Sequence, residues 1–376
     1  MQRKRCFVFI VLLAASPSVA QSTRQNALAL ESQGQFAEAE QAWQQIAEKG
    51  PRNAEAFAHL GLLEARQQNY GQAITWYRRA LALDPSYPGL EMNLGLALFK
   101  AERFQEAIQP FTAELKKHPG DQRLLILLGM SHYGMGDYLA AVPYLKRAAA
   151  ADPKNLPLRL ALAHACLWSK QSQCVMNVYK EILALNAESA EADMLAGEAL
   201  DEEGKVVEAT QQFRAATKAN PKEPNVHFGL GYLLWEQKQY DEALKEFQAE
   251  LDNDPQSSQS LAYLGDTYVE LNDYDKALPA LEKAATAVPS TAFVHRDLGV
   301  VYASLGRKDE AVAELQKAIA LDPKDVTPHW RLGRLYQSMG KKEEAKAEFT
   351  KASTMNKESV QALVEKLGQD HSTPQQ

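Results

Sequence analysis

A period of 34 residues runs through almost the whole chain and constrains its fold more than any other feature. Glycine keeps this period between Gly61 and Gly333, and alanine keeps it between Ala39 and Ala345. Proline recurs at the same spacing at Pro51, Pro85, Pro119, Pro153, Pro221, Pro255, Pro289 and Pro323. Self-similarity at such a period is typical of arrays built from one supersecondary unit. The sequence therefore predicts a stack of repeats rather than a set of globular domains.

Each unit has the pattern of a helical hairpin. In the second unit, Leu60 and Gly61 precede Ala73, Tyr77 and Ala80 at spacings that place apolar residues on one face of two successive helices. Glycine and alanine allow the two helices to approach closely. Proline follows the second helix because it cannot continue a helix. One hairpin cannot bury its own apolar face, so neighbouring hairpins must stack.

The order of these residues resembles the tetratricopeptide repeat. The tenth unit is a good copy of the pattern, with Leu332, Gly333, Tyr336, Ala345, Phe349 and Ala352. The resemblance covers roughly residues 20 to 357. It implies an all-α solenoid of about ten 34-residue helix-turn-helix repeats, coiled into a right-handed superhelix. The first helices of the units are then expected to line a concave groove.

Four segments are predicted along the chain. Residues 1–20 resemble a signal peptide, because three basic residues precede the apolar run from Phe7 to Ala15, and small residues precede a cleavage site after Ala20. Residues 21–357 form the ten-unit solenoid. Residues 358–368 form a C-terminal capping helix with Gly368 as its stop, and residues 369–376 form a disordered tail. The capping helix is inferred from an apolar stripe at Val360, Leu363, Val364 and Leu367.

The signal predicts an exported protein, located in the periplasm or outside the cell. Its apolar run is too short to cross a bilayer, which needs about 20 apolar residues, so no stable membrane insertion is expected. The chain is acidic, with 41 basic against 48 acidic residues and a net charge of −7. It has no basic block, which argues against nucleic-acid binding.

Catalytic, cofactor and metal sites are not expected. The repeats leave no stretch of domain size for a catalytic fold, so the chain is predicted not to be an enzyme. His227, His295 and His329 occupy one repeat position. Equivalent positions in neighbouring units lie roughly 8–10 Å apart, whereas zinc ligands lie about 2 Å from a shared ion. These histidines are therefore expected to pack between repeats.

The family resemblance implies that one stripe of each first helix lines the groove. The predicted partner-binding residues are Phe99, Met130, Tyr133, Trp168, Tyr232, Trp235, Tyr263, Arg296, Arg331 and Arg334. Large aromatic residues and methionines supply affinity and adaptable contacts at interfaces. The alternative is that many of the apolar ones only pack between neighbouring helices. Only Asn93 and Arg331 fit the pattern of a clamp for a C-terminal carboxylate, so that subtype is not expected.

The predicted function is a non-catalytic protein–protein interaction scaffold of the bacterial cell envelope. Its partners are other proteins or peptide segments, bound in the concave groove, and an association with an envelope complex is compatible with the sequence. The alternative is a fixed structural subunit of an envelope assembly or of a polysaccharide-export complex.

The fifth unit departs from the pattern and holds two cysteines. Ala163, Val175 and Ala187 replace the usual glycine, alanine and proline. The repeat positions of Cys166 and Cys174 place them across one short hairpin, and an exported compartment is oxidising. The sequence therefore predicts a disulfide between them. The alternative is two buried, reduced cysteines that behave as small apolar residues.

Overall fold

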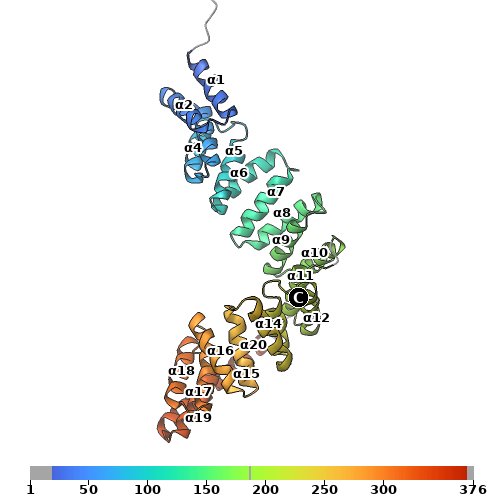
Figure 1. Cartoon of the computed structure of the whole chain (residues 1–376), viewed down its shortest axis with the longest axis vertical. Coiled ribbons are helices and arrows are strands. Elements are labelled where there is room, and N and C mark those ends of the chain that lie inside the picture. The colour runs from blue at the N-terminus through green and yellow to red at the C-terminus, as the bar shows by residue number, and fades with distance from the viewer. Residues whose placement is uncertain (1–18, 186–187, 371–376) are drawn as a thin grey trace, which may run out of the picture. The chain divides into compact units, whose positions relative to one another are not determined.

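The computed structural model describes residues 19–185 and 188–370, which form helices and no strand (Figure 1). Twenty helices follow one another along this described part of the chain, α1 to α20. Successive helices pair as hairpins from α1 to α8 and from α11 to α20. Most of the predicted signal, residues 1–18, and most of the predicted tail, residues 371–376, lie outside the described residues. No helix in the described ranges is long and apolar enough to cross a membrane.

The chain divides into two compact units, Met1–Gln171 and Ser172–Gln376. The first contains α1 (Val19–Ser32), α2 (Phe36–Lys49), α3 (Ala54–Arg66), α4 (Tyr70–Leu83), α5 (Leu90–Lys100), α6 (Phe104–Lys117), α7 (Gln122–Gly134), α8 (Tyr138–Ala151) and α9 (Leu156–Trp168).

The second unit begins in the degenerate fifth repeat. It contains α10 (Ser172–Leu185), α11 (Ala190–Glu202), α12 (Val206–Ala219), α13 (Val226–Glu236), α14 (Tyr240–Asn253), α15 (Ser258–Glu270), α16 (Tyr274–Ala287), α17 (Ala292–Ser304), α18 (Lys308–Leu321), α19 (Thr327–Ser338) and α20 (Lys342–Asp370).

Close crossing of the two helices of a hairpin depends on the periodic glycine, as the sequence predicted. A Cβ atom added at Gly61 would lie 2.6 Å from the ring of Tyr77. The same added atom at Gly333 would lie 2.7 Å from the ring of Phe349. Both distances are shorter than van der Waals contact, so a side chain at these positions would push the helices apart. The helix-turn-helix repeat is thereby confirmed at the residues that define it.

The turn inside each hairpin contains a residue with positive φ, and these residues also recur every 34 positions. They are Gly34, Gln68, Glu102, Gly136, Lys170, Gly204, Lys238, Asn272, Gly306 and Gly340. Positive φ ends a helix sharply, and glycine adopts it at least cost. Five of the ten are not glycine, so glycine spacing alone did not reveal this second periodic feature.

First helices of successive hairpins contact one another along the second unit and at one place in the first. In the second unit α11, α13, α15, α17 and α19 form such a row, and in the first unit α3 contacts α5. The second helices have no comparable contacts in the described residues. The shorter spacing on the side of the first helices makes that side the concave one. The superhelical hand stays a prediction.

The C-terminal end differs from the prediction of a separate capping helix. Helix α20 runs without a break from Lys342 to Asp370, so residues 358–368 continue it and Gly368 does not stop it. Lys357 stands where other units have proline, and nothing there prevents the helix from continuing. Val360 is 59% exposed on this continuation.

Candidate functional site

Two predicted groove residues of the first unit meet in an aromatic cluster. The rings of Tyr133 and Trp168 lie 5.6 Å apart. Tyr138 joins them, 5.4 Å from Tyr133 and 4.7 Å from Trp168. Trp168 is 47% exposed, so this cluster offers aromatic surface to a ligand. Tyr138 was missed by the sequence analysis, although it begins a second helix at the same repeat position as Tyr70 and Tyr240.

Phe99 and Met130 are half-buried on α5 and α7. Phe99 packs edge-on against Phe104 at 5.3 Å and belongs to the margin of the hydrophobic core. For Phe99 the alternative interpretation therefore holds, because its ring packs between helices. No described ring contact joins Phe99 to the cluster of Tyr133, Tyr138 and Trp168, and Met130 has no ring to join it.

Three predicted residues of the second unit form a larger cluster on α13 and α15. The ring of Tyr263 lies 5.2 Å from Trp235 and 5.4 Å from Tyr232, both in edge-to-face geometry. Such pairs are stabilising beyond the area that they bury. The cluster continues to Phe228, 5.9 Å from Tyr263, and to Phe293, 5.3 Å from it. All three predicted residues are half-buried, so each keeps part of its ring exposed on the concave side.

A partly buried polar network supports this aromatic cluster. The Trp235 indole N–H donates to Asp266 at 2.6 Å. Arg296 donates to Asp266 at 3.2 Å and to Asp297 at 2.8 Å. Both carboxyl groups are buried, with 3% of each residue exposed. Arg296 is therefore held by two buried acids while 26% of its side chain stays exposed, and its part in partner binding stays a prediction.

Burial is the largest influence on Asp297 and raises the pKa of its carboxyl group well above the ordinary value. The neighbouring Arg296 lowers this pKa, and the adjacent Asp266 raises it further. Burial makes the charged form of a carboxyl group less favourable, and so does a second acid that shares the same cation.

Arg331 and Arg334 lie together on α19, where both side chains are exposed. They line an open cavity of about 290 Å³ between α17 and α19, together with Val300 and Ala303. The structure therefore brings these two predicted residues to one place. The row of first helices thus presents aromatic surface at α13 and α15 and basic surface at α19.

The three repeat histidines each pair with a carboxylate of their own hairpin. His227 lies 2.6 Å from Glu246, and His295 lies 2.6 Å from Glu314. His329 contacts Glu348, again 19 residues later. These pairs join the first and second helices of one hairpin. His295 also lies 3.0 Å from the carbonyl oxygen of Pro289, in the loop that follows the preceding hairpin, so it contacts the neighbouring repeat as expected. No cluster of metal-ligating residues occurs in the ranges that the structure describes.

Cys166 is buried on α9, and Cys174 lies half-buried on α10. Each is disulfide-bonded in the structure.

Comparison with models of known protein families identifies the same kind of repeat in several segments of the chain. One model, described as "Tetratricopeptide repeat", matches residues 24–88, 177–224, 208–258 and 264–326. A second model with the same description matches residues 132–173 and 302–367. The first model alone matches more than half of the chain.

Curated relatives are distant and partial. A BBSome complex member, BBS4 of Bos taurus, is 26% identical over 136 residues, 36% of this chain and 26% of that protein. A repeat-containing protein of Methanocaldococcus jannaschii is 23% identical over 40% of this chain and 27% of its own length. The chain thus spans about a quarter of the length of these relatives. The protein O-mannosyl-transferase TMTC1 of Mus musculus is 26% identical over 134 residues, only 14% of that protein.

Solved structures share the fold. The pilF protein of Pseudomonas aeruginosa matches with a TM-score of 0.50 and 19% identity, covering 55% of this chain and 94% of that one. YrrB, described as a repeat protein with an unusual peptide-binding site, matches with a TM-score of 0.43 and 21% identity over 50% of this chain and 97% of its own. At these identities the likeness concerns the fold alone.

Proposed function

Since the chain belongs to the tetratricopeptide repeat family, we propose that it is a non-catalytic scaffold of the bacterial cell envelope that holds partner proteins or peptide segments on the row of first helices. Proteins of this family are generally interaction scaffolds. The described residues contain no cluster that could hold a metal ion, and the described helices are accounted for by repeats.

The cluster of Tyr232, Trp235 and Tyr263 is the observation on which this proposal rests. Its rings contact one another, and a partly buried hydrogen bond from Trp235 to Asp266 fixes the orientation of the indole. Rigid, partly exposed aromatic side chains give binding energy at low entropic cost. They lie on α13 and α15, on the concave side of the second unit.

Photo-crosslinking tests this surface. A photoreactive residue in place of Tyr232 should crosslink to specific partners, whereas one in place of Val207 should not. Val207 is a matched control because it is an apolar residue of the same unit, 61% exposed on a second helix. Equal crosslinking from both positions contradicts the proposal.

Loss of the tyrosine ring tests the same surface by affinity. Tyr232→Ala should weaken capture of the crosslinked partner about tenfold, the loss expected for a partly buried aromatic contact. The far-ultraviolet circular dichroism should stay unchanged. Tyr232 suits this test better than Trp235, because loss of the indole would also remove a donor to buried Asp266. Unfolding of Tyr232→Ala would instead assign this ring to the core.

Export is part of the proposal and rests on residues 1–20. Fusion of these residues to a reporter should give export and cleavage after Ala20. Recovery of the full-length protein in the cytosol with Met1 intact contradicts it.

The alternative function is a fixed subunit of an envelope assembly or a polysaccharide-export complex. A scaffold has a free pool and releases its partners, whereas a fixed subunit copurifies with a membrane complex and has no free pool. Fractionation of the envelope followed by crosslinking separates these two functions.

A further inference from the structure

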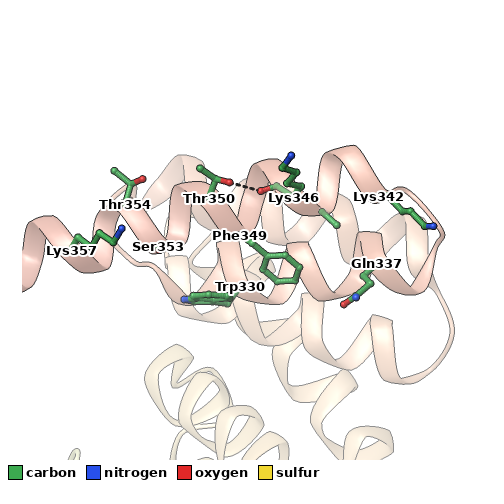
Figure 2. A pocket seen from close by; sticks show the side chains of 10 residues that line it. Trp330, Gln337, Lys342, Lys346, Phe349, Thr350, Ser353, Thr354 and Lys357 are labelled. Atoms are coloured by element: carbon green, nitrogen blue, oxygen red, sulfur yellow. Dashed lines mark hydrogen bonds between the residues drawn. The ribbon is translucent and has the colours of Figure 1, made fainter.

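The surface between α19 and α20 is hollowed into an open pocket of about 670 Å³ (Figure 2). Trp330 and Phe349 form its apolar part, with ring centroids 5.5 Å apart. Trp330 is 40% exposed. Figure 2 shows Lys342 and Lys357 at opposite ends of the lining, and Lys346 also lines it. Among the described lining residues there is no carboxylate.

The preceding hairpin shows what the equivalent surface holds. Leu315, 34 residues before Phe349, belongs to a buried cluster with Leu332 and Leu335 of α19. The side-chain amide of Gln316 on α18 donates to the hydroxyl of Tyr336 on α19 at 3.3 Å. The first helix of one hairpin therefore fills the surface of the hairpin before it. No further helix follows α20 in the described residues, and there the equivalent surface stays open, with Trp330 40% exposed.

The polarity of such an occupant follows from the same comparison. Lys308, at the start of α18, donates to the carbonyl oxygen of Ser338 at the last residue of α19, 3.1 Å away. Lys342 occupies the equivalent position at the start of α20. A cation stabilises the carbonyl end of a helix. A helix in the pocket would thus place its C-terminal end at Lys342 and its N-terminal end towards Lys357.

We propose that this pocket docks an acidic amphipathic helix of a partner protein in the place of an eleventh first helix. Its apolar stripe covers Trp330 and Phe349, and its carboxylates face Lys342, Lys346 and Lys357. Opposite charge across an interface speeds association and selects among partners. This surface is separate from Tyr232 on α13, so the proposal goes beyond the one made above and can fail independently of it.

The probe is a labelled, end-capped peptide of residues 190–202, the most acidic first helix of this chain. It carries Glu191, Asp193, Glu198, Asp201 and Glu202. Its fluorescence anisotropy should rise in a saturable way with the full chain. An equally labelled peptide of residues 327–338 is a first helix of opposite charge, with Arg331 and Arg334, and should bind at least tenfold more weakly. Binding of the acidic peptide should also weaken with added salt.

Charge reversal locates the site. Lys342→Glu with Lys346→Glu should lower the affinity for the acidic peptide at least tenfold, and so should Trp330→Ala. The matched control is Lys317→Glu with Lys324→Glu, which reverses two exposed charges outside the pocket and should change the affinity less than twofold. Circular dichroism checks that each variant is folded.

The proposal would be overturned by equal binding of both peptides, by unchanged affinity after reversal of the pocket lysines, or by loss of binding in Tyr232→Ala instead. Concentration-dependent association of the chain that depends on Lys342 and Lys346 would assign the pocket to a second copy, and would overturn the proposal as well.

Discussion

Asp297 shows how burial sets the behaviour of a single residue. Burial raises its pKa in the folded protein, whereas the pKa of an aspartate in an unfolded chain is about 3.9. As the pH rises above that value, the unfolded chain loses this proton while the folded chain keeps it, so folding stability falls until the folded-state pKa is passed. Below the unfolded pKa this loss is absent.

Asp297→Asn should therefore remove this loss. Relative to the wild type, the variant should gain stability as the pH rises above about 3.9, the ordinary pKa of an aspartate, as measured by denaturant unfolding at each pH. Asp309→Asn, an exposed change on α18, should follow the wild type. Parallel profiles for wild type and Asp297→Asn would contradict the raised pKa.

The cysteines give a second prediction at this scale. Mature protein unfolded without reductant should show no free thiol, because Cys166 and Cys174 are each disulfide-bonded. Closure of so short a loop contributes roughly 2.5 kcal/mol by the chain-entropy estimate, so Cys166→Ser should lower stability by up to this amount. Two free thiols per chain would leave the alternative of reduced, buried cysteines.

At the scale of the element, the turn inside each hairpin determines where a helix ends. Lys238 has φ of 59° and Gly306 has φ of 78° at equivalent positions. The left-handed conformation costs a residue with a Cβ atom about 1 kcal/mol or more, and an added Cβ at Gly306 meets no atom within 4 Å. The difference between these two turns is therefore one of backbone conformation.

Reciprocal substitutions test this cost. Gly306→Ala should destabilise the protein by about 1 kcal/mol. Lys238→Gly should stabilise it by about 0.5 kcal/mol, since the greater freedom of glycine in the unfolded chain offsets part of the gain. Thermal unfolding measures both. Effects of the same sign in the two variants would contradict the argument.

At the scale of the whole molecule, stability is expected to be local, because each repeat contacts only its neighbours. Deletion of Val360 to Gln376 should expose the last repeat to faster hydrogen exchange and leave the exchange of α3 to α6 unchanged. Loss of all protection together would show that the chain does not unfold as a repeat array.

Much of the candidate surface was predictable, because the position of a residue in the repeat indicates which way its side chain faces. The period placed Tyr232, Trp235 and Tyr263 on first helices, and the structure brings their rings together. Tyr138 was missed although its position also recurs. The partners of Arg296 could not be read in this way, since Asp266 lies one repeat earlier along the chain and meets it only after stacking.

The sequence by itself determined the all-helical repeat, the hairpin crossing and the family, because these depend on local periodicity and on residues too small to hold two helices apart. Only the tertiary structure decided which polar side chains are already paired. Arg296 is held by buried acids, and each repeat histidine pairs with a glutamate of its own hairpin. It also decided that α20 continues past Lys357 and leaves the surface of Trp330 and Phe349 uncovered. The physical reason is that hydrogen bonding and burial depend on side chains that stacking brings together from distant positions.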